Sequence, residues 1–118
     1  YVYTAVAQSI GTAHDIIIGF DPTVDKIDLP SGISVTAIDA AVSSGAASAS
    51  TLDSDLTSAL ASLGAHHAVT FTPSSGDLAG HTLEVIDTDG VTGYQAGADM
   101  VIELQSPVSS ITVTTPFI

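Results

Sequence analysis

Aspartates that recur at short intervals among turn-forming residues are the side chains in this sequence best suited to chemistry. Four of them (Asp15, Asp21, Asp25 and Asp28) surround one turn that also contains glycine and proline. Calcium takes about six to eight oxygen ligands from carboxylates, backbone carbonyls and water, and these four residues could supply several. The alternative is a polar turn between two strands, in which the carboxylates cap backbone groups and face solvent.

A second acidic group is more widely spaced. Asp87 and Asp89 stand before Gly90, in the order that begins an EF-hand loop, but Ala98 occupies the position of the bidentate Glu. A hairpin turn with Asp at its start is therefore the alternative to a metal loop. If the hairpin folds back, Asp99 can complete a calcium site together with Asp87 and Asp89.

No motif for catalysis is present. The sequence lacks Gly-x-Ser-x-Gly, a phosphate-binding Gly-Lys-Ser/Thr loop and His-Glu-x-x-His. His66 and His67 are adjacent, so on a strand they point to opposite faces, and the other two histidines lie far away in sequence. Glu84 and Glu103 are the only glutamates, and nothing marks them as an acid/base pair. We therefore expect a protein that is not an enzyme.

The charge balance restricts the partners and the location. Thirteen acidic residues accompany one basic residue, Lys26, and the net charge is −12. Nucleic acid and anionic membranes are poor partners, because affinity for both depends on Lys and Arg. No apolar run is long enough for a transmembrane helix, so membrane insertion is not expected. An acidic chain with almost no Lys suits a calcium-rich extracellular location. The absence of Cys leaves the redox compartment undecided. A start in mid-pattern at Tyr1 predicts a piece of a longer protein with an upstream domain.

Local patterns predict the elements that position these residues. Leu52, Leu56, Leu60 and Leu63 repeat at helical spacing after a possible capping box at Ser50 to Asp53, and a second short helix is expected over residues 37–42. Alternating or β-branched runs predict strands over residues 1–6, 15–20, 26–29, 67–72, 81–86, 99–104 and 110–113.

These elements predict a mostly β fold with one or two helices. With 45% hydrophobic and 5% aromatic residues, the core must be built mainly from aliphatic side chains. We expect a single domain, 1–118, that forms either a β-roll end or a β-sandwich with a helical insert. Its parts are a closing segment (1–32), the helical insert (33–65) and a β-rich tail (66–118).

Two stretches carry a resemblance to a known family. Residues 1–5 (Tyr-Val-Tyr-Thr-Ala) and 9–29 (Ser-Ile-Gly-Thr-Ala-His-Asp-Ile-Ile-Ile-Gly-Phe-Asp-Pro-Thr-Val-Asp-Lys-Ile-Asp-Leu) resemble the segment that closes the calcium β-roll of repeats-in-toxin (RTX) proteins, including serralysin-type proteases. Residues 76–104 are similar to bluetail-like tails of RTX-type bacterial surface proteins. The glycine-rich nonapeptides that bind most of the calcium in this family are absent here, so the resemblance implies at most a closing calcium set at Asp15, Asp25 and Asp28.

The resemblance implies a function. The chain would be a non-catalytic C-terminal domain of an extracellular or cell-surface bacterial protein, capping an upstream calcium β-roll. It would also carry the uncleaved signal that a type I secretion apparatus reads. The alternatives are a surface or adhesion module that binds a partner, and an accessory domain of a secreted hydrolase.

The final residues are where such a signal is expected. The β-branched run 111–115 is followed by a bulky apolar end, and the signal residues would be Ile111, Val113, Phe117 and Ile118. Many RTX proteins place an acidic residue in this region, but none lies between Glu103 and Ile118 here. The alternative is a last strand that completes the sheet.

Overall fold

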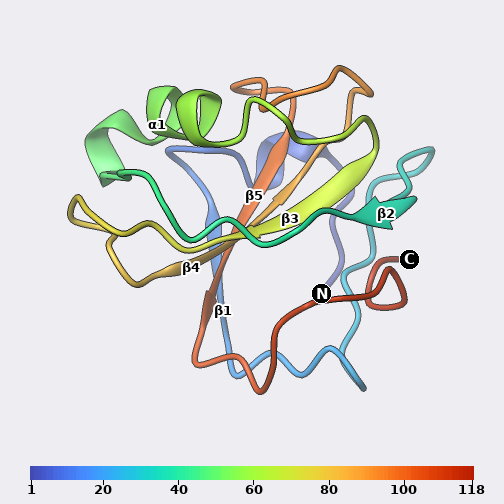
Figure 1. Ribbon diagram of the computed structural model, residues 1–118. Coiled ribbons are helices and arrows are strands. Elements are labelled where there is room, and N and C mark those ends of the chain that lie inside the picture. The colour runs from blue at the N-terminus through green and yellow to red at the C-terminus, as the bar shows by residue number, and fades with distance from the viewer.

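The computed structural model describes all residues 1–118 and contains one five-stranded mixed sheet with a single α-helix on one face (Figure 1). The strands lie in the order β1-β5-β4-β3-β2. The central three form an antiparallel meander, while β1 pairs parallel with β5 and β2 pairs parallel with β3. The elements are η1 (Val6–Gln8), β1 (Asp15–Ile18), β2 (Ala37–Ile38), η2 (Ala49–Thr51), α1 (Leu52–Ala59), β3 (His67–Phe71), β4 (Thr82–Ile86) and β5 (Met100–Gln105).

The central strands are apolar on both faces because both faces of the sheet are covered. On one face, Leu52 and Leu56 of α1, together with Leu60 and Leu63 of the turn that follows it, pack against alternate residues of β3, β4 and β5. All four leucines of the predicted stripe are buried, although the regular helix ends before Leu60. Phe71 is fully buried in the same cluster. The predicted helix and the predicted strands over residues 67–72, 81–86 and 99–104 are confirmed.

The other face is covered by irregular chain from both ends of the sequence. Phe20 and Ile27 come from the first part, and Ile111 and Phe117 come from the tail. They pack against alternate residues of β5 and against Ile17 of β1. This second core draws the two chain ends to the same side of the molecule (Figure 1).

The chain ends are joined by isolated parallel bridges rather than by regular strands. Val2 bridges to Asp28, and Ile27 bridges to Phe117. The Leu29 amide donates to the Ile118 carbonyl oxygen at 2.7 Å. The predicted strands over 1–6, 26–29 and 110–113 are therefore wrong as regular elements: isolated bridges form at Val2, Ile27 and Asp28, and none forms over 110–113.

Two local predictions in the middle of the chain are also wrong. The segment expected to form a helix over 37–42 instead contains β2, because its backbone pairs with β3 at Ala37 and Ile38. The helix does not begin with a capping box at Ser50 and Asp53. Asp55 takes that role, and its Oδ2 accepts hydrogen bonds from the Ser48 amide at 3.0 Å and the Thr51 hydroxyl at 2.7 Å.

The structure confirms a mostly β fold with one helix, and no β-roll forms within residues 1–118. The sheet takes β1 from the predicted closing segment, β2 from the helical insert and the remaining three strands from the tail. All three parts therefore contribute to one sheet.

Candidate functional site

The connection between β4 and β5 brings two acidic residues together at one end of the sheet. Ile86 pairs with Met100 at the last register position of this hairpin. Asp87 follows β4 directly and Asp99 precedes β5 directly, so the hairpin places the two carboxylates next to each other. The loop 87–99 therefore folds back as the candidate metal loop requires.

Asp87 is fully buried, but only one of its two carboxylate oxygens accepts hydrogen bonds. Its Oδ1 accepts hydrogen bonds from the His66 amide at 3.0 Å and the Gly90 amide at 2.7 Å. Gly90 has φ +76°, a left-handed conformation that glycine adopts readily. Asp87 Oδ2 is also buried and has no hydrogen-bond partner. A buried carboxylate oxygen without a partner costs free energy, so this atom marks a position where a ligand would be stabilising.

The carboxylates of Asp89 and Asp99 lie close to that of Asp87. Asp99 is fully buried, with Oδ1 accepting from the Thr88 amide at 2.9 Å and Oδ2 from the Gln95 amide at 2.7 Å. Asp89 is exposed and accepts from the Val91 amide at 2.8 Å. One ligand oxygen from each aspartate lies within 4.8 Å of the others. Ligands at about 2.3–2.6 Å from one calcium ion lie at most about 5 Å apart, so this spacing fits a single ion.

The negative charges of Asp87, Asp89 and Asp99 lie close enough together to affect a pKa. Burial, together with the charges of Asp87 and Asp89, raises the pKa of Asp99 to about 6, although hydrogen bonds from the Gln95 and Thr88 amides oppose the shift. No Lys or Arg is paired with these carboxylates. A bound cation would offset this charge at a pH at which the carboxylates are ionised.

The donor set is made of oxygen atoms only. Besides the three carboxylates, the Oε1 atom of Gln95 is buried in the same loop without a hydrogen-bond partner. Oxygen ligands suit hard cations such as calcium and magnesium rather than zinc or copper. No signal in the sequence singles out Gln95 beyond its position inside an acidic loop that ends in Asp99.

The first predicted acidic group is arranged differently. No three of Asp15, Asp21, Asp25 and Asp28 come together as possible metal ligands. Asp21 accepts hydrogen bonds from the amide and the hydroxyl of Thr23, and these bonds lower its pKa. Asp25 accepts from the Asp21 amide at 2.9 Å. Two of the four thus hold the turn in the way that the alternative interpretation predicts.

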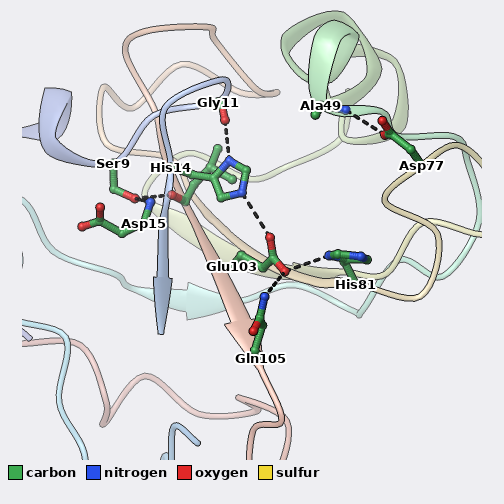
Figure 2. Close-up of polar contacts among 10 residues, drawn as sticks. Ser9, Gly11, His14, Asp15, Ala49, Asp77, His81, Glu103 and Gln105 are labelled. Carbon is green, nitrogen blue, oxygen red and sulfur yellow. Dashed lines mark hydrogen bonds and ion pairs between the residues drawn. The ribbon is translucent and has the colours of Figure 1, made fainter. Parts of the chain in front are cut away.

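A separate polar cluster surrounds Glu103 on the helix-covered face of the sheet (Figure 2). The carboxylate lies between His14 Nε2, at 3.3 Å, and His81 Nδ1, at 2.7 Å, and it accepts a third bond from Gln105 at 3.2 Å. Burial raises the pKa of Glu103, but these hydrogen bonds outweigh burial and hold the pKa below its ordinary value. The two histidines are far apart in sequence, and they meet at Glu103 only because β1 and β4 both pair with β5.

The two glutamates are not partners. Glu103 shares its face of the sheet with the helix, whereas Glu84 lies on the opposite face and is fully buried. The hydroxyl of Thr70 donates to Glu84 Oε2 at 2.8 Å, and Glu84 Oε1 has no partner. Burial raises the pKa of Glu84 to about 8, although the bond from Thr70 opposes the shift.

The predicted signal residues divide into two kinds. Ile111 and Phe117 are buried in the core on the side away from the helix, while Val113 and Ile118 are exposed. In the folded protein residues 106–118 are therefore anchored by a few buried side chains, while most of the other residues there are exposed.

Comparison with protein-family models, curated proteins and solved structures finds no match to this chain. None of its helices has the length and apolar character needed to span a bilayer.

Proposed function

We propose that this chain is a non-catalytic, calcium-binding C-terminal domain of a secreted RTX-type bacterial protein. The observation that carries the proposal is the buried carboxylate of Asp87, which has an unpaired Oδ2 atom and belongs to a cluster in which one oxygen from each of Asp87, Asp89 and Asp99 lies within 4.8 Å of the others. Calcium bound there would satisfy that atom and offset two of the three negative charges.

Calcium fits this loop better than magnesium does. Magnesium demands near-ideal octahedral geometry and loses its water reluctantly, so it is seldom held by a protein cage. Here two carboxylates are fully buried, and a side-chain amide oxygen lies unpaired in the same loop. A larger ion with flexible coordination suits such a set.

Calcium binding can be tested directly by isothermal titration calorimetry at pH 7.5. We expect one calcium site in the unmodified protein, at least tenfold weaker binding in Asp87→Asn, and no such loss in Asp28→Asn. The first variant keeps an oxygen that can accept from His66 and Gly90 but removes the charge at the free position. If Asp28→Asn abolishes binding and Asp87→Asn does not, the ion belongs to the first acidic group and the proposed site is wrong.

The capping role is supported by the parallel bridges at the chain ends. Val2 is exposed, and its segment pairs in parallel with the segment around Asp28, which pairs in parallel with the segment around Phe117. A preceding β-roll is also built from parallel strands, so it could stack on this group and have its exposed edge covered.

The secretion role is supported by the way the tail folds. Two predicted signal residues are core residues of the folded domain, so an exporter could read them only before folding. Calcium outside the cell would then bind and stabilise the native state alone, and folding would be completed after export.

Export is tested by fusing residues 1–118 to a slow-folding reporter in a strain with a working type I exporter. We expect the fusion in the medium, and loss of export when residues 106–118 are deleted. The double variant Val113→Asp/Ile118→Asp should also lose export while melting normally, because both side chains are exposed. Undiminished export without residues 106–118 would exclude a signal in the tail.

A further inference from the structure

The two edge strands of the sheet, β2 and β1, differ in how well they are protected from pairing with another chain. At one edge, β2 contains only two residues and offers little backbone to a new strand. At the other edge, β1 contains four residues, pairs with β5 alone and has no Pro, Lys or bulge. Those are the usual devices that keep an edge strand from pairing with another chain, so β1 is an available edge.

The exposed side chains of β1 are apolar. Ile16 is 52% exposed and Ile18 is 72% exposed, although each is a large aliphatic residue in a regular strand. They lie on the helix-covered face of the sheet but beyond the cluster that α1 covers, since neither belongs to that core. Water therefore reaches the part of the sheet where a further strand would lie.

A groove continues this surface across the sheet. In the parallel register Ile16 is opposite Glu103 and Ile18 is opposite Gln105, so the four side chains share one face. Glu103 and Gln105 line a groove of about 410 Å³ together with His81. We call the five residues Ile16, Ile18, His81, Glu103 and Gln105 the β1 edge surface.

The charge of the molecule decides which kind of partner suits this surface. The net charge is −12, and the single Lys26 is engaged with the Thr115 carbonyl oxygen at 3.0 Å. A second copy would bring two strongly negative bodies together, whereas a cationic segment is attracted. Asp15 is exposed on the face of β1 opposite to Ile16 and Ile18, so basic side chains would lie on one face and apolar side chains on the other.

We propose that β1 is a docking edge for an extended cationic segment of another protein, which adds a strand beside it and alternates basic with aliphatic residues. Backbone pairing with β1 supplies affinity, and the side chains beside Ile16 and Ile18 supply specificity. This surface is separate from the calcium loop, so it does not depend on the function proposed above.

The test uses a labelled seven-residue peptide of alternating Lys and Val with blocked ends, and binding is followed by fluorescence anisotropy. Ile18→Lys places a charge on the docking face and should weaken binding about tenfold or more. Val24→Lys is the matched control, because Val24 is 71% exposed, lies in the turn after the strand and undergoes the same change of charge. It should change binding by no more than about twofold on charge alone.

A second peptide separates strand pairing from simple charge attraction. Replacing its central Val with Pro keeps every charge but removes a backbone donor, so binding should be lost. Equal binding of the two peptides, or equal effects of Ile18→Lys and Val24→Lys, would overturn the proposal. Sedimentation that shows a peptide-free dimer abolished by Ile18→Lys would also overturn it, since the edge would then be covered by a second copy.

Discussion

Replacing Glu84 with Gln is expected to raise the free energy of unfolding by about 3–5 kcal/mol at pH 9 and to change it little at pH 4. The carboxyl group is fully buried, keeps one hydrogen bond from Thr70 and has one oxygen with no partner. Burial disfavours the charged form, and it raises the pKa from its ordinary 4.5 to about 8. Gln has nearly the same shape and stays neutral at every pH.

The direction of this effect follows from the raised pKa. In the unfolded chain Glu84 loses its proton near pH 4.5, whereas the folded protein holds the proton until about pH 8. The folded state is thus favoured most below pH 4.5, and that stability is lost as the pH rises from 4.5 to 8. Glu84→Gln has no such pH-dependent loss, so the difference in the free energy of unfolding between the two proteins grows as the pH rises.

Urea unfolding at pH 4, 6 and 9, in buffer with a calcium chelator, measures the difference. Glu103→Gln is a suitable control, because hydrogen bonds lower the pKa of Glu103 and its charged form is the stabilising one. That variant should be less stable than the unmodified protein at pH 9. Loss of stability at pH 9 in Glu84→Gln would contradict the buried, uncompensated carboxyl group described here.

The second large effect concerns calcium and Asp87. At a calcium concentration about one hundred times the dissociation constant, binding stabilises the native state by about 2.7 kcal/mol. We expect the unmodified protein to melt about 10 °C higher in calcium than in chelator. Asp87→Asn should melt higher than the unmodified protein in chelator, because one buried like charge is removed, and lower than the unmodified protein in calcium.

This reversal of order distinguishes a metal site from ordinary charge repulsion. Asp28→Asn removes the same charge at a position outside the loop, so its melting temperature should rise with calcium as that of the unmodified protein does. Calcium stabilisation should also weaken below about pH 6, where Asp99 retains its proton in the folded protein. If Asp87→Asn were the more stable protein both with and without calcium, the carboxylates of the loop would only repel one another and would not form a calcium site.

Local patterns in the sequence predict the elements whose stability is local. The leucine spacing of α1 and the apolar runs of β3, β4 and β5 need only neighbouring residues to be interpreted, and each is found as predicted. The hairpin between β4 and β5 follows from the same signals, and this is why the cluster of Asp87, Asp89 and Asp99 could be predicted from sequence.

Contacts between distant segments could not be predicted in this way. The parallel pairing of Ile16 with Glu103 joins the two ends of the chain, and no local signal specifies such a register. The cluster of His14, Glu103 and His81 depends on that pairing. The segment around Ala37 has helical composition but forms β2, because pairing with β3 outweighs a weak local preference.

The most direct test of the calcium site is a titration of the isotope-labelled protein with calcium, followed through the backbone amide signals. We expect the largest shifts in residues 87–99, with the amides of Gly90, Thr88 and Gln95 prominent because they donate to the ligand carboxylates. Residues 15–28 should change little. Shifts confined to residues 15–28, or no saturable shift at millimolar calcium, would contradict a calcium site in this loop.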